Sequence, residues 1–91
     1  MIQNIDVVCL IKQDSSVTPL QIIWHDGRKF DVDRVLDVRR VASTKGGGKG
    51  IRYTCRIMGK QKYLFLDGYH WFVEVDAPSG VNPNGEQAAN N

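Results

Sequence analysis

Basic side chains are the clearest chemistry that this sequence offers. From Val38 to Leu66 the chain carries eight Lys or Arg residues and no Asp or Glu. The remaining residues hold the other four basic groups and all ten acidic ones, so a block of +8 stands against a remainder of −6. Such a basic patch indicates a polyanionic partner, because each phosphate that a Lys or Arg neutralises releases bound counterions.

Five of these cations are candidates for contacting nucleic acid. They lie in or beside a Gly/Lys segment, residues 45–50. The glycines of this segment leave the backbone accessible at the tip of a predicted hairpin. Tyr63 is a candidate stacking surface for a base, whereas strand alternation places Tyr53 inward. A solvated basic face without a dedicated ligand and a docking site for an acidic protein surface are the alternatives. The candidate residues are Arg39, Arg40, Lys45, Lys49 and Arg52.

Catalytic and metal-binding patterns are not indicated. Residues 45–50 superficially resemble a phosphate-binding loop, but that motif needs Ser or Thr after its Lys and then a helix. Here Gly50 and a predicted strand follow Lys49. His25 and His70 are the two histidines, and neither has further ligands at a spacing typical of a metal site. We therefore expect no cofactor, no metal and no enzymatic activity.

The two cysteines and the N-terminal segment bear on where the protein resides. Cys9 and Cys55 lie in alternating apolar runs, which is typical of buried free thiols, with a disulfide as the alternative if their strands adjoin. The N-terminal segment reaches Asp6 without a basic stretch, unlike a signal peptide. No apolar run approaches about 18 residues, so we expect a cytoplasmic protein with no membrane partner.

Alternation of apolar and polar residues, the period of a β-strand, dominates the chain. It predicts six strands near residues 5–12, 20–25, 30–38, 51–58, 62–66 and 71–75. Tight turns are expected at Asp26–Gly27, Gly59–Lys60 and Asp67–Gly68. Within the third strand Arg34 falls on the apolar face, which predicts a bulge or bend near Asp33–Arg34, with a short helical turn over 33–38 as the alternative.

These strands predict an all-β antiparallel meander. At this size the sheet should curl into a small SH3-like barrel or a strongly bent sheet, formed by a single domain over residues 1–76. Residues 77–91 lack aromatic side chains and predict a disordered tail. Trp24 and Trp71 are expected to form a core pair, or else an aromatic ligand-binding patch on an open face.

The pairing of the third and fourth strands decides how much of the basic block is free. A register that places apolar residues on one face sets Leu36 opposite Ile57 and Val38 opposite Cys55. It also predicts three neutralising pairs on the outer face: Asp37 with Arg56, Asp33 with Lys60, and Asp31 with Lys62.

The central part of the chain, about residues 19–75, resembles a family of small uncharacterised bacterial proteins. The resemblance rests on Trp24–Phe30, a W-x-x-G-R-x-[FY] hairpin, on an R-Y strand over Arg52–Ile57, and on the terminal W-F-V strand at Trp71–Glu74. It implies a compact all-β bacterial cytoplasmic protein, and it brings no functional residues with it.

Two functions therefore remain in view. The first is a small all-β binding module that contacts nucleic acid through the basic hairpin end. The second is a protein–protein interaction or assembly module without a nucleic-acid role, such as a homodimer formed through an exposed strand edge.

Overall fold

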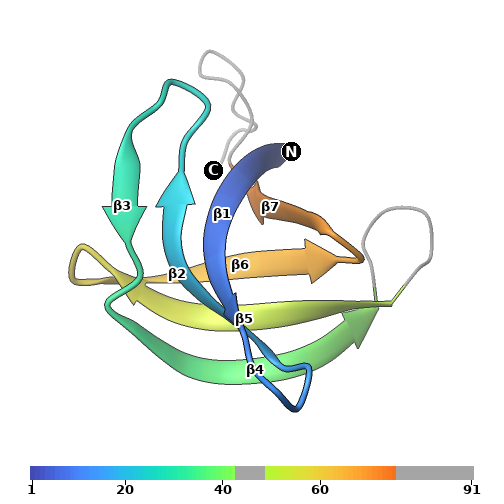
Figure 1. The fold of residues 1–91 in the computed structure, drawn as a ribbon. Helices are drawn as coiled ribbons and strands as arrows, with labels where there is room; N and C mark the ends of the chain where they lie inside the picture. The colour runs from blue at the N-terminus through green and yellow to red at the C-terminus, as the bar shows by residue number, and fades with distance from the viewer. Residues whose placement is uncertain (43–48, 76–91) are drawn as a thin grey trace.

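Seven antiparallel strands form one strongly curled sheet in the computed structural model of the protein, which describes residues 1–42 and 49–75 (Figure 1). The strands follow one another across the sheet in the order β3-β2-β1-β7-β6-β5-β4. The predicted all-β class and bent sheet are confirmed, and the described residues contain no helix. The predicted disordered tail lies outside the described residues. The strands are β1 (Ile2–Ile11), β2 (Val17–Ile23), β3 (Lys29–Asp31), β4 (Arg34–Ala42), β5 (Lys49–Ile57), β6 (Lys60–Asp67) and β7 (His70–Glu74).

The first strand, β1, belongs to both halves of the curled sheet. Its first residues pair with β7, and its later residues pair with β2. The register with β2 shifts between Val8 and Cys9, where the extra residue is Leu20 of β2; bulges of this kind bend the strand that carries them. Figure 1 shows β4 and β5 curving beneath β1 and β2. The Tyr53 hydroxyl of β5 accordingly reaches β2, where it donates a hydrogen bond of 2.7 Å to the carbonyl oxygen of Val17.

The predicted third strand is two strands, β3 and β4, which lie at opposite ends of the strand order. The chain changes direction at Val32 and Asp33. The Val32 amide donates to the Leu20 carbonyl oxygen of β2 at 2.9 Å, and the next amide, of Asp33, donates to the Arg56 carbonyl oxygen of β5 at 2.9 Å. A bend was therefore predicted in the right place, and the helical alternative is wrong.

The turns differ in detail from those predicted. The β2–β3 connection is a three-residue loop rather than a two-residue turn: the Trp24 amide donates to the Arg28 carbonyl, and Gly27 adopts a φ of 90°. This combination matches a type I turn followed by a glycine bulge. Between β5 and β6 the turn residues are Met58 and Gly59, with φ values of 51° and 75°. Positive φ at both positions is the mark of a type I′ turn.

The core lies on the inner face of the sheet. Trp71 packs against Tyr53 with ring centroids 5.3 Å apart, while Trp24 is partly buried at the rim of the same cluster. Cys9 and Cys55 are free thiols. Burial raises the pKa of Cys55 to about 11, so its thiol stays protonated near neutral pH. The buried core residues are Ile5, Ile22, Tyr53, Cys55, Ile57, Leu64, Leu66 and Trp71.

Candidate nucleic-acid-binding face

The register between β4 and β5 differs from the predicted one by two residues over Asp37–Ala42, and by three at Arg34 and Val35, before the bulge. Val38 lies opposite Tyr53 rather than opposite Cys55, and Val35 takes the place opposite Cys55. A shift of two residues preserves which side chains share a face, so alternation alone does not exclude it. The extra residue is Leu36, which lies where the register shifts, between Val35 and Asp37, and is 41% exposed.

The three predicted neutralising pairs are wrong as a result. Arg56 lies opposite Arg34, and Asp37 lies opposite Thr54. Among the described residues the ion pairs are Arg39–Asp37, with Nε and Oδ2 2.8 Å apart, and Arg28–Asp26 at 2.7 Å. Asp31 instead accepts a hydrogen bond from Gln21. The cations of β6, Lys60 and Lys62, lie opposite the core residues Ile57 and Cys55.

One face of β4, β5 and β6 gathers arginines and aromatic rings, because directly opposed residues of antiparallel strands share a face. One row runs Arg34–Arg56–Gln61, the next Asp37–Thr54–Tyr63, and the third Arg39–Arg52–Phe65, continuing to Phe72 of β7. Asp37 is the one carboxylate in these described rows. We call this surface the arginine face and define it by Arg34, Arg39, Arg52, Arg56, Tyr63 and Phe65.

Arg52 and Tyr63 form the centre of the arginine face. The Arg52 guanidinium carbon lies 4.7 Å from the centroid of the Tyr63 ring, within the range of a cation–π contact. The Tyr63 residue is 46% exposed. The Arg52 Nε is buried and has no hydrogen-bond partner among the described residues. Such an unsatisfied donor is rare in folded proteins and calls for an explanation.

A second aromatic surface adjoins the first. Phe65 and Phe72 stack in parallel, with centroids 5.1 Å apart and ring planes 9° apart. Phe72 is buried, whereas Phe65 is partly exposed. The arginine face therefore offers two aromatic rings at its surface, Tyr63 and Phe65, next to four guanidinium groups. This combination can stack bases and neutralise phosphates on one side of a sheet.

The structure divides the five predicted site residues. Arg39 and Arg52 lie directly opposite each other on the arginine face, whereas Arg40 lies opposite Ile51 on the other face. The backbone of Lys49 pairs with Ala42 in the β4–β5 ladder, and Lys45 lies outside the described residues. The predicted cluster at the hairpin end includes residues outside the described part of the chain, so it stays a prediction.

Sequence reasoning missed Arg34, Arg56 and Phe65 as members of this face. The alternation Arg52-x-Thr54-x-Arg56 in β5 is the signal that could have grouped Arg56 with Arg52. The inward placement of Tyr53 is confirmed, since this residue is 2% exposed, whereas Tyr63 is exposed at the surface and its stacking role stays a prediction.

Residues 1–42 and 49–75 offer neither a metal-binding cluster nor a membrane-spanning helix. No group of three or more His, Cys, Asp or Glu side chains in these ranges is arranged to hold a metal ion. No helix in them is long and apolar enough to cross a membrane. No family model, curated protein or solved structure matches the chain. The resemblance to small bacterial proteins therefore stays a prediction.

Proposed function

We propose that this protein binds single-stranded nucleic acid on the arginine face of β4, β5 and β6. The observation that supports the proposal is the placement of four arginines and two surface aromatic rings on one sheet face, with Asp37 as the one carboxylate in the same described rows. Proteins that bind single strands without sequence preference combine these two elements, a cationic surface for the backbone and rings on which bases stack.

Each element of the face has a distinct part in the proposed complex. Tyr63 stacks a base on one side of its ring. The Arg52 guanidinium, which lies over the Tyr63 ring, extends the stack on the other side. Arg34 and Arg56, both exposed and opposite each other, contact phosphates. Each neutralised phosphate on a single strand adds about 0.7 to the salt dependence, so four arginines give a slope of log K on log salt of about −3 at most.

The test is a fluorescence-anisotropy titration of labelled oligothymidine over a series of salt concentrations. Tyr63→Ala is expected to weaken binding by about 1–3 kcal/mol, the usual contribution of one stacked base. Arg34→Gln and Arg56→Gln are each expected to weaken it and to lower the salt slope by about 0.7. Arg40→Gln is the matched control, because Arg40 is an exposed arginine of the same strand on the opposite face.

Two results would contradict the proposal. One is the absence of any binding at low salt. The other is an Arg40→Gln variant that loses as much affinity as Arg56→Gln, since that outcome places the contact at the hairpin end or makes it a diffuse charge effect rather than a property of the arginine face.

Assembly through a strand edge is the second candidate function, and β4 is the observation that favours it. This strand ends the strand order, so its outer edge pairs with no described strand, and it exposes Leu36 and Val38, the latter by 54%. An exposed apolar edge is a template for pairing with another copy. Sedimentation equilibrium tests this candidate: a dimer that Val38→Lys dissociates supports it, and a monomer at all concentrations removes it.

A further inference from the structure

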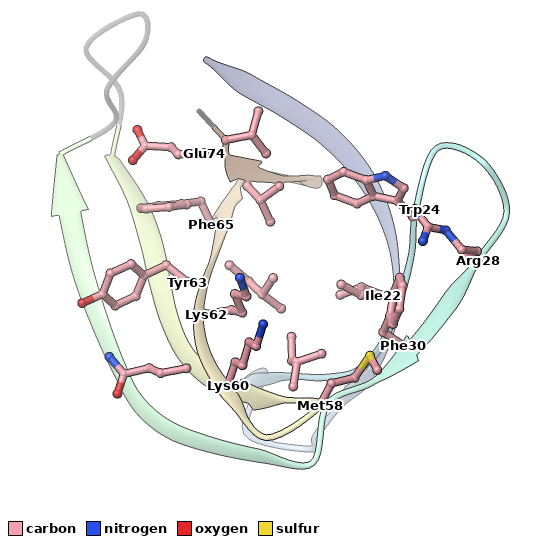
Figure 2. Close-up of a pocket in the computed structure, with 15 residues that line it drawn as sticks. Ile22, Trp24, Arg28, Phe30, Met58, Lys60, Lys62, Tyr63, Phe65 and Glu74 are labelled. Carbon is pink, nitrogen blue, oxygen red and sulfur yellow. The ribbon is translucent and has the colours of Figure 1, made fainter. Parts of the chain in front are cut away.

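A hollow of about 620 Å³ opens where β6 and β7 part (Figure 2). β7 pairs with β6 only over Phe65–Asp67, whereas β5 pairs with β6 from Lys60 through Leu66. Beyond Phe65 the two strands are no longer paired, and residues 60–64 of β6 and 73–75 at the end of β7 both border the hollow. The sheet is therefore split along one side of β6.

The hollow follows the edge of β6 rather than one of its faces. Lys60 and Lys62 line it from the inner face, and Gln61 and Tyr63 line it from the outer face. Successive side chains of a strand point to opposite faces, so a space bordered by both sets lies beside the backbone. Over these residues no described strand pairs with that edge. Unpaired edge groups of this kind accept an added strand.

The far wall of the hollow is apolar. Figure 2 shows Ile22, Trp24 and Phe30, from β2, β3 and the loop between them, facing Lys60 and Lys62 across the space. The wall gives an occupant an apolar surface to cover. The volume of the hollow lies in the range of ordinary binding pockets.

The charge around the hollow is predominantly positive. Lys60 and Lys62 point from β6 into the space, and neither forms an ion pair with a described residue. Arg28 is a third cation at the rim, where Asp26 holds it, and Glu74 is the acidic residue of the lining. Two unpaired ammonium groups beside a free strand edge select an occupant that carries carboxylates.

We infer that the hollow binds an extended acidic peptide segment of another protein, which adds as a strand to the free edge of β6. The main chain of the peptide pairs with residues 60–64, and alternate acidic side chains meet Lys60 and Lys62. The intervening side chains lie beside Tyr63 on the other face. This site borders the arginine face at Tyr63 and Phe65 but uses other charged residues, because Lys60 and Lys62 leave β6 on the side opposite that face.

The test uses three acetylated heptapeptides that alternate Glu with Val, Thr or Tyr, titrated into the ¹⁵N-labelled protein and followed by amide chemical shifts. Binding is expected to shift the amides of residues 60–64. Lys60→Gln and Lys62→Gln are each expected to weaken it several-fold, while Lys29→Gln, an exposed lysine outside the lining, leaves it unchanged. A copy of the best peptide, N-methylated at alternate residues, is expected to bind at least about tenfold more weakly, because methylation removes strand hydrogen bonds.

Several outcomes would overturn the inference. One is the absence of any amide shift with all three peptides at millimolar concentration. Another is equal binding of the N-methylated copy. A third is binding of decanoate at Lys60 and Lys62 without peptide binding, which would make the hollow a site for small amphipathic anions. The Lys60→Gln variant separates this inference from the proposed function. It is expected to lose affinity for the peptide while it binds oligothymidine as the unchanged protein does.

Discussion

Replacing Arg52 by Met is expected to stabilise the fold while it weakens nucleic-acid binding. In the free protein the Arg52 Nε is buried without a partner, and Arg39 lies directly opposite across the ladder. Met keeps an apolar stem of similar length against Tyr63 but carries no donor and no charge. A buried donor that costs stability in the free protein has its best explanation in what it binds.

The size of the effect follows from three contributions. An unsatisfied buried donor costs about 1–3 kcal/mol, and its removal stabilises the protein by that amount. Relief of the like-charge pair with Arg39 adds about 0.2–1 kcal/mol. Loss of the cation–π contact with Tyr63 subtracts about 0.5–1 kcal/mol at a surface site. The balance is a gain centred at about 2 kcal/mol, and each kcal/mol raises the Tm of a domain this small by roughly 4–8 °C.

Thermal and urea unfolding, monitored by circular dichroism, measure this gain. Arg39→Met is the matched control: it relieves the same repulsion, loses an exposed ion pair with Asp37, and leaves the buried Nε in place, so its net effect is about zero. A fall in Tm for Arg52→Met, or equal shifts for the two variants, would refute the reasoning about the buried donor. Unchanged oligothymidine affinity in Arg52→Met would refute the functional explanation of why the donor is there.

Three further predictions concern the fold. Tyr53→Phe removes the hydrogen bond to β2 and is expected to cost about 1–2 kcal/mol in urea unfolding, whereas Tyr63→Phe, whose hydroxyl has no described partner, is expected to cost about zero; equal losses would contradict the assignment. Met58→Asn is expected to raise the free energy of unfolding by about 0.5–1 kcal/mol, because Asn tolerates the φ of 51° better than Met does, and a loss of stability would count against the turn geometry. Burial raises the pKa of Cys55 from 9.0 to about 11, so the unfolded state releases this proton first and stability falls as pH rises through that interval, by about 2–3 kcal/mol in total. Urea titrations at a series of pH values check this, with Cys55→Ala expected to lose that part of the decline.

The sequence predicted the strands and their faces better than it predicted their partners. Alternation in β5 placed Tyr53 and Cys55 inside correctly, because that property is local to one strand. The β4–β5 register was wrong for two reasons. From Asp37 onward it is shifted by two residues, which keeps every face unchanged, and before the bulge at Leu36 it is shifted by three, which moves Arg34 from the predicted apolar face to the outer one. The placement of Arg34 on the arginine face depends on that register, whereas Arg56 shares a face with Arg52 through the alternation of β5 alone.

The hollow beside β6 was beyond sequence reasoning for a different reason. It exists because β6 and β7 are paired at one end and not at the other. This divergence is set by the way β7 follows β1, a strand that lies about 70 residues earlier in the chain. The alternation of residues within one strand carries no information about where two strands far apart in the chain pair and where they diverge.

The double pairing of β1 has a consequence for the order in which the chain acquires its structure during synthesis. Ile2 pairs with Glu74, and the Met1 carbonyl accepts the Val75 amide at 2.8 Å. The later half of β1 can form its hairpin with β2 as soon as both have left the ribosome, because that contact is local. Its first half must wait, unpaired, until almost all of the sheet has been translated. The earliest strand made is therefore the last one finished, and an N-terminal edge stays open to wrong partners throughout that interval.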